Sequence, residues 1–131
     1  MATSPIYATT PKVGSVAAAG FDTSLTAPST TATVLTGGTS GSKVEEIIIQ
    51  GTGTVAAGVV NLWLYDGSNY SLFDQILLTA VTSSTTAVAF RAVRQYTNLW
   101  LPSNSWTLRV THTVTANDTN KLRVTALYAD Y

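Results

Sequence analysis

The chain has 131 residues, no cysteine, and seven basic against seven acidic residues, so its formal net charge is zero. The lack of cysteine excludes disulfides and thiolate metal sites, and the charge balance gives no positive field for a nucleic-acid backbone or an anionic membrane. Only 11% of the residues are charged, whereas 45% are hydrophobic, and a chain of this length fits one domain. Threonine, serine, asparagine and glycine must therefore cover much of the surface, as is typical of β-proteins that work in assemblies or outside cells.

Residues 1–30 are predicted to form an N-terminal arm. This segment holds Pro5, Pro11 and Pro28 and shows no sustained strand or helix period. Residues 13–21 could form a helical turn, although they lack a good cap. Two interpretations stay open: a loosely docked tail, and an ordered arm that reaches a neighbouring subunit.

The start of the chain also bears on where the protein is made. The residues MATSPIYATTPK have no basic segment followed by an apolar core, which argues against a secretory signal. No apolar run approaches the ~20 residues that a membrane helix needs. We therefore expect a soluble protein, synthesised in the cytoplasm and without membrane contact.

From residue 31 onward, short apolar runs alternate with Gly, Ser, Thr and Asn clusters, which predicts an all-β domain over residues 31–131. The predicted strands are 31–36, 43–51, 58–65, 70–79, 86–94, 105–115 and 121–130, with a short extended piece at 99–101. No helical crossover separates them, so we expect an antiparallel two-sheet sandwich.

The centre of this domain is predicted to be a β-hairpin at residues 58–79. Its two strands flank the turn from Asp66 to Asn69, and Asp-Gly is a favoured hairpin turn pair. Alternation places Val60, Leu62 and Leu64 on one face of the first strand. The opposite face carries Trp63 and Tyr65, and is expected to be either a second buried face or a contact surface.

The last two strands alternate most cleanly between apolar and polar residues. Trp106, Leu108, Val110, His112 and Val114 share one side of their strand, as expected for a sheet with one wet face. The turn at residues 116–120 predicts that the strands at 105–115 and 121–130 form a hairpin. The run of three isoleucines at 47–49 predicts that the end of this strand is covered on both sides, so the strand is expected to lie mid-sheet or under a partner.

No group of residues predicts catalysis. His112 is the only histidine, it falls on the apolar side of its strand, and no nucleophile or metal-spacing motif accompanies it. Glu45 and Glu46 are adjacent, so they point to opposite faces of a strand and cannot act as a pair. The chain is expected not to be an enzyme and to need no cofactor or metal.

The aromatic residues admit two interpretations. Trp63, Tyr65 and Tyr70 could form a stacking platform for sugars, as in a carbohydrate-binding or adhesin-like module at a fibre or tail tip. Burial in the core or in a subunit contact is the commoner role of such residues. We favour the second interpretation and keep the first as the alternative function.

Four segments resemble a known group of proteins in their order and motifs. They are GSKVEEIII (41–49), GTGTVAAGVV (51–60), LYDGSNYSLF (64–73) and LPSNSWTLR (101–109). Over residues 41–131 the chain resembles small proteins of tailed-phage structural gene clusters, among them capsid decoration or cement proteins. The resemblance implies a jelly-roll-like β-sandwich that binds the outer surface of an icosahedral shell, often as a trimer, and clamps neighbouring major capsid proteins.

The expected function is therefore that of a structural virion protein on the capsid exterior. Its expected partners are the major capsid protein and itself, as a homotrimer, with no direct contact to nucleic acid. Many weak contacts repeated over a lattice would give strong attachment without any chemistry. The candidate subunit or capsid contacts are Pro5, Tyr7, Pro11, Trp63, Tyr65 and Trp100.

Overall fold

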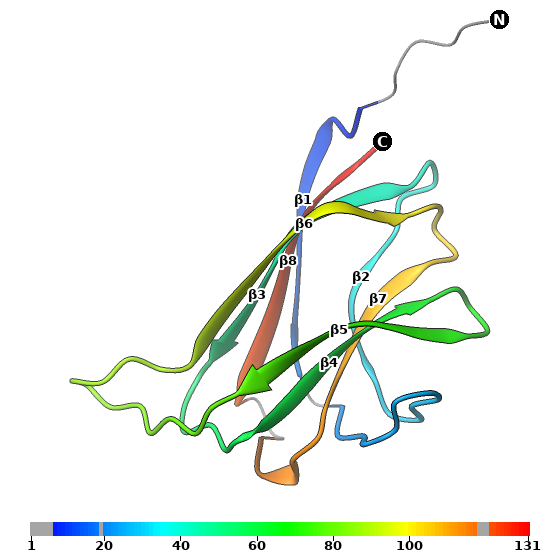
Figure 1. Cartoon of the computed structure of the whole chain (residues 1–131). Helices are drawn as coiled ribbons and strands as arrows, with labels where there is room; N and C mark the ends of the chain where they lie inside the picture. The colour runs from blue at the N-terminus through cyan, green and yellow to red at the C-terminus, as the bar shows by residue number, and fades with distance from the viewer. Residues whose placement is uncertain (1–6, 19, 118–120) are drawn as a thin grey trace, which may run out of the picture.

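The computed structural model describes residues 7–18, 20–117 and 121–131, and these residues form eight strands and one short 3-10 helix (Figure 1). Val, Ile, Leu and Thr dominate the strands, in keeping with the preference of such residues for pleated, half-buried surfaces. The elements are β1 (Thr10–Ala17), β2 (Ala32–Thr36), β3 (Ser42–Gly51), β4 (Gly58–Tyr65), β5 (Tyr70–Leu78), β6 (Arg91–Leu101), β7 (Thr107–His112), η1 (Thr115–Asn117) and β8 (Leu122–Asp130).

The strands form two four-stranded antiparallel sheets that pack face to face, which confirms the predicted β-sandwich. Sheet A has the order β1-β8-β3-β6, and sheet B has the order β2-β7-β4-β5 (Figure 1). The pairing is nested, since β1 lies beside β8, β2 beside β7, β3 beside β6 and β4 beside β5.

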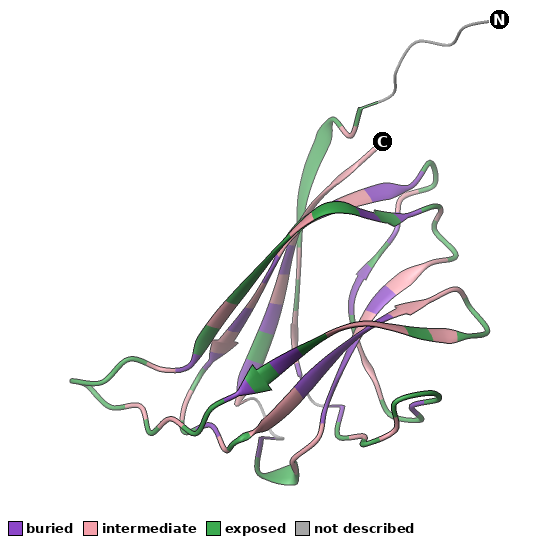
Figure 2. Ribbon diagram, viewed as in Figure 1, coloured by how far each residue is buried: buried purple, intermediate pink, exposed green. Residues whose placement is uncertain are grey.

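The core lies between the two sheets (Figure 2). Alternate residues of each strand point inward, and the largest fully buried side chains are mainly aliphatic, among them Ile47 and Ile49 of sheet A and Leu62 and Leu108 of sheet B. Ile48, between the two buried isoleucines, is only half-buried. β3 is central in its sheet, as expected, but the chain itself does not fully cover the outer face of the isoleucine run.

The hairpin of β4 and β5 forms as predicted. Its turn uses Gly67 at a φ of +101°, a conformation that favours glycine. The Asp66 carboxylate accepts the N–H groups of Ser68 and Asn69 at 2.8 and 2.7 Å. These bonds stabilise the charged carboxylate, so they lower the pKa of Asp66.

The predicted hairpin between the last two strands is wrong. β7 pairs with β2 and β4 in sheet B, whereas β8 pairs with β1 and β3 in sheet A. β7 and β8, although consecutive in the chain, therefore lie in different sheets. Local turn chemistry favoured a hairpin, but each of the two strands pairs on both sides with strands distant in sequence.

Residues 91–94 of the predicted strand at 86–94 and the extended piece at 99–101 belong to one strand, β6, whereas residues 86–90 are not in a strand. β6 is irregular where Val44 and Glu46 of β3 face it, because the pairing shifts there. Residues 96–98 of β6 lie between the two registers of this pairing. The sequence between the two predicted pieces therefore shows no regular alternation.

Part of the predicted arm belongs to the sandwich. Residues 10–17 form β1, which pairs with β8 along its full length, so a helical turn at residues 13–21 is ruled out over the strand. Gly14 allows β1 to pack closely on β2, since a Cβ atom there would lie 2.5 Å from the carbonyl oxygen of Val34. The boundary between arm and domain thus lies before Thr10 and not at residue 30.

Candidate functional site

The outer face of sheet A, which points away from sheet B, is a regular surface formed by four strands. Directly paired residues on neighbouring antiparallel strands point to the same side, so its side chains form rows across the sheet. In the order β1, β8, β3, β6 the rows are Pro11, Ala129, Lys43 and Trp100 (the Trp100 row); Val13, Leu127, Glu46 and Gln95 (the Glu46 row); Ser15, Thr125, Ile48 and Val93 (the Ile48 row); and Ala17, Arg123, Gln50 and Arg91 (the Arg91 row).

This face exposes apolar side chains. Val13 is 66% exposed, Trp100 is 51% exposed and Val93 is 39% exposed. A mainly apolar groove of about 510 Å³ runs along β1 and β8, with Pro11, Val13, Leu127 and Ala129 among its lining residues. Apolar side chains gathered on one sheet face mark an interaction surface more often than single exposed residues do.

Three of the predicted contact residues lie at or near the upper end of this face. Pro11 and Trp100 stand at opposite ends of the Trp100 row. Tyr7 precedes β1 and is 72% exposed. Pro5 lies outside the described residues. The sequence therefore identified both ends of one row, without the two residues between them.

Trp63 is fully buried by the chain itself, on the side of β4 opposite the core residue Leu62. Its indole N–H donates a 3.0 Å hydrogen bond to the Thr111 hydroxyl. The Trp63 side chain is therefore covered within the chain, which is one of the two roles expected for it, and it is not exposed to a partner or to a sugar. The hydroxyl of Thr111 satisfies the one polar atom of the ring, which makes this burial favourable.

Tyr65 and Tyr70 form an aromatic pair beside Trp63. Their rings stack with centroids 4.3 Å apart, and the Arg109 guanidinium lies 4.4 Å from the Tyr65 centroid. The Tyr70 ring also meets Trp63 edge-on at 6.0 Å. The rings therefore pack on one another and on Arg109, an arrangement that stabilises the outer face of sheet B and leaves Trp63 out of any sugar platform.

A carboxylate anchors β1 at the upper end of sheet A. Asp130 of β8 accepts a 2.6 Å hydrogen bond from the Ser42 hydroxyl of β3, and its other oxygen lies 2.7 Å from the Lys12 ammonium of β1. Ser42 in turn accepts the N–H of Gly38. The bond to Lys12, followed by that to Ser42, lowers the pKa of Asp130, and the same contact raises the pKa of Lys12.

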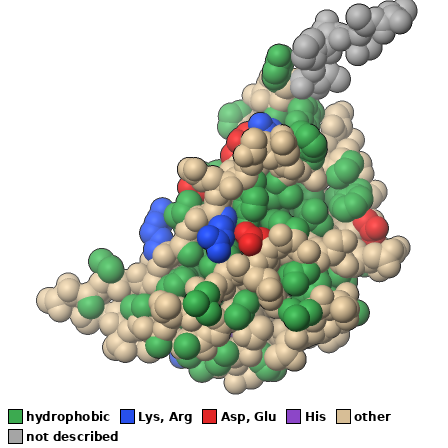
Figure 3. Space-filling model, viewed as in Figure 1, with side chains coloured by type: hydrophobic (Ala, Val, Ile, Leu, Met, Phe, Trp, Pro, Cys, Tyr) green, Lys and Arg blue, Asp and Glu red, His purple; other side chains and the backbone are tan. Residues whose placement is uncertain are grey.

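Hydrophobic side chains gather on the side of the sandwich between β5 and β6, on the face seen in Figure 3. The partly buried residues Leu64, Phe73, Tyr96 and Trp106 pack against the core. Asp74 of β5 joins the two edges: it accepts a 2.7 Å hydrogen bond from the Tyr96 hydroxyl and lies 3.5 Å from the Arg94 guanidinium. Burial, and then the bond to Asp74, raises the pKa of Tyr96.

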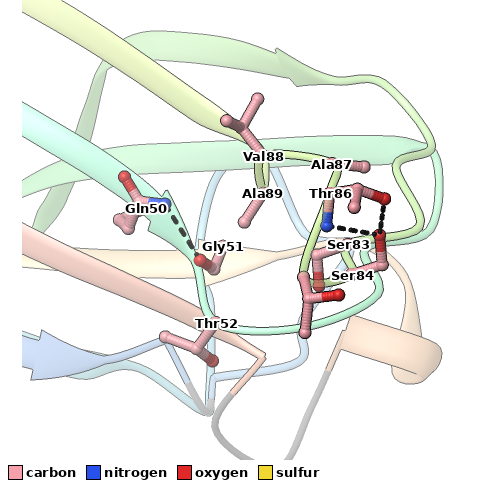
Figure 4. Close-up of a pocket in the computed structure, with 10 residues that line it drawn as sticks. Gln50, Gly51, Thr52, Ser83, Ser84, Thr86, Ala87, Val88 and Ala89 are labelled. Atoms are coloured by element: carbon pink, nitrogen blue, oxygen red, sulfur yellow. Dashed lines mark hydrogen bonds between the residues drawn. The ribbon is translucent and has the colours of Figure 1, made fainter.

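A hollow of about 590 Å³ lies between the end of β3 and the β5–β6 loop (Figure 4). It is lined by Gln50, Gly51 and Thr52 and by residues 83–89. None of these lining residues is ionisable, and the Ser84 and Thr86 hydroxyls bond to each other at 3.3 Å. The hollow thus lacks the acid, base or nucleophile set that catalysis would need.

His112 is fully buried at the end of β7. Its backbone N–H donates to the Gly20 carbonyl at 2.8 Å, and its ring lies 6.0 Å from that of Phe21. These contacts tie the segment after β1 to sheet B, which is a structural role. Within the described ranges, no three His, Cys, Asp or Glu side chains are grouped to hold a metal ion, and no helix there has the length and hydropathy to span a membrane.

Comparisons of the chain with models of protein families, with curated proteins and with solved structures found no match. The surfaces of the molecule and the resemblance in its sequence are therefore the basis for a function.

Proposed function

We propose that the chain is a structural virion protein, a decoration or cement protein that binds the capsid exterior of a tailed bacteriophage. Its partners are the major capsid protein and further copies of itself. The observation that carries the proposal is the exposure of Tyr7 and Trp100 at the upper end of sheet A. Exposed aromatic and apolar groups of this kind are suited to docking on a protein surface.

The topology agrees with this proposal. The nested strand pairing supports a jelly-roll plan, the architecture that the resemblance implies. Jelly rolls serve as viral capsid proteins and as lectins, so the fold alone does not select between them. Burial of Trp63 favours the capsid role, because it removes the central ring of the sugar-binding alternative.

We assign the shell contact to Tyr7 and the Trp100 row. Pro11 lies on β1, an edge strand of the sheet, where it has no N–H to donate and so discourages strand addition to that edge. Contact through side chains, and not through backbone pairing, is therefore expected here. Repetition over the lattice would make such small contacts collectively strong.

The test is to purify virions made with this chain and to measure its copy number by mass spectrometry. Shells lacking the chain are then mixed with the pure protein. We expect Trp100→Ser to lower shell occupancy, and Leu77→Ser, at a residue 70% exposed on sheet B, to leave it unchanged. Virions without the chain, or equal occupancy for both variants, would refute the proposal.

A further inference from the structure

The charge of the side chains changes along the strands across the lower three rows on the outer face of sheet A. The Glu46 row carries an acidic residue, the Ile48 row is uncharged, and the Arg91 row carries Arg123 and Arg91 on either side of Gln50. The acidic and basic ends are therefore separated by a neutral, partly apolar centre.

These charges lack ion-pair partners within the described part of the chain. The ion pairs there are Lys12–Asp130, Lys43–Glu45 and Arg94–Asp74. Arg91 instead donates to the Gln50 side chain at 3.3 Å, and Arg123 donates to the Ser15 hydroxyl at 3.2 Å. Glu46, Arg91 and Arg123 thus keep their charge available for a partner.

We propose that this face pairs with the same face of a second copy, related by a two-fold axis through the Ile48 row and perpendicular to the strands. This axis places the Arg91 row of one copy over the Glu46 row of the other. Glu46 then lies between Arg91 and Arg123 of the partner, because both residues 46 and 50 belong to β3. The arrangement repeats twice by symmetry, as in any isologous contact.

The centre of the pair fits this arrangement. Ile48 and Val93 meet their own copies at the axis, so the half-buried isoleucine and the exposed valine become covered. Neighbouring strands are ~4.8 Å apart and alternate residues ~6.8 Å apart, so three rows over four strands cover roughly 20 Å by 20 Å. A contact of that size is at the small end for specific interfaces, and we expect a weak, concentration-dependent pair.

The pair leaves the Trp100 row outside the contact at both ends. This inference deepens the proposed function, on which its biological meaning rests, by naming the surface that joins two copies. It differs from the trimer that the resemblance implies, because a face that pairs with itself closes at two copies. Its test uses purified protein alone, so its failure is distinct from failure to bind a shell.

The test is a charge exchange followed by sedimentation equilibrium over a wide concentration range. The wild type is expected to dimerise. Arg91→Glu with Arg123→Glu gathers three acidic groups at each contact, and Glu46→Arg gathers three basic ones, so each variant alone should self-associate at least tenfold more weakly. A mixture of the two variants should restore the pair, because each contact again joins opposite charges.

Cross-linking locates the axis independently. The chain has no cysteine, so Ile48→Cys introduces a single thiol, and a short bis-maleimide should join two copies through it. Leu77→Cys, on sheet B, is the matched control and should stay uncoupled. A wild type that remains monomeric, a mixture that fails to restore association, or equal coupling of the two thiols would each overturn the proposal.

Discussion

The hydroxyl of Tyr96 donates a 2.7 Å hydrogen bond to Asp74, and this bond joins the edge strand of sheet A to the edge strand of sheet B. Arg94, on the same strand as Tyr96, adds an ion pair to the same carboxylate oxygen. β5 and β6 share no strand pairing. The separation of the sheets on this side is thus held by side chains and not by backbone hydrogen bonds.

Tyr96→Phe should destabilise the protein by about 1.5 kcal/mol, the lower end for a hydrogen bond to a charged acceptor, because the site is only partly buried. Urea unfolding measures the change. Tyr65→Phe removes a 2.9 Å bond from an exposed hydroxyl to the Gly67 carbonyl and is the matched control, expected to have little effect. Equal losses for the two variants would show that the edge bond has no special role.

The raised pKa of Tyr96 predicts an alkaline dependence of stability. The folded state holds this proton more tightly than the unfolded chain, so the contribution is complete below about pH 10, the ordinary tyrosine value. It is lost as the pH rises toward the higher folded pKa. Tyrosinate absorbance should show Tyr96 as a late-titrating group that Tyr96→Phe removes; loss of an early-titrating group instead would contradict the assignment.

Asp130 predicts the opposite dependence at acid pH. Its folded pKa is lowered, chiefly by the bond to Lys12, so its contribution is present above the ordinary value of about 4 and is lost as the pH falls through the folded pKa. Wild type and Asp130→Asn should therefore differ in unfolding free energy at neutral pH and converge at low pH. Asp22 and Asp66 also have lowered pKa values. Both residues are present in the wild type and in the variant, so their contributions cancel in the difference. A gap that does not change with pH would refute the ionic anchor.

Trp63→Ala should cost about 3 to 5 kcal/mol of unfolding free energy, because it removes a large buried side chain and leaves a cavity. Trp100→Ala, at a half-exposed position, is the matched control and should change stability little. Urea titration followed by circular dichroism measures both. If Trp63→Ala folded with unchanged stability, the buried packing of this ring would be disproved.

Gly14→Ala should loosen β1, since the new Cβ would lie 2.5 Å from the Val34 carbonyl oxygen. Overpacking of this kind typically costs about 1 to 3 kcal/mol. Hydrogen exchange should become faster in β1 and in the part of β8 that pairs with it. Gly53→Ala, where no atom lies within 4 Å of the new Cβ, provides the control, and slow exchange in both variants would argue against close packing of β1 on β2.

The strands of the sandwich were predictable where alternation is strong. β4 and β5 are rich in aliphatic and aromatic residues and flank a turn with glycine, so local preference and tertiary structure agree. β1 was missed because TPKVGSVA contains small and turn-forming residues, and its strand conformation depends on pairing with β8. That pairing spans more than a hundred residues of sequence, and no local pattern reports it.

The candidate site was predictable only in part for a related reason. Alternation showed that Trp63 and Leu62 point to opposite faces of their strand. A period-2 pattern does not say which of these faces is covered by other parts of the chain. The rows on sheet A join residues from both ends and the middle of the chain, such as Val13, Glu46 and Leu127. These residues share a face because of the strand order. The hairpin predicted for the last two strands implied a different strand order, so the rows could not be predicted.

The pairing of the first strand with the last has a consequence for engineering. The N–H of Thr9 bonds to the carbonyl of Asp130 at 3.0 Å, so a short peptide could join Tyr131 to Tyr7. The loop between β5 and β6, where Val88 is 88% exposed, offers a place to open the chain. A circular permutant cut there would begin at β6 and end at β5, with both sheets retained, and its new ends would emerge far from the old ones for the display of a fused cargo.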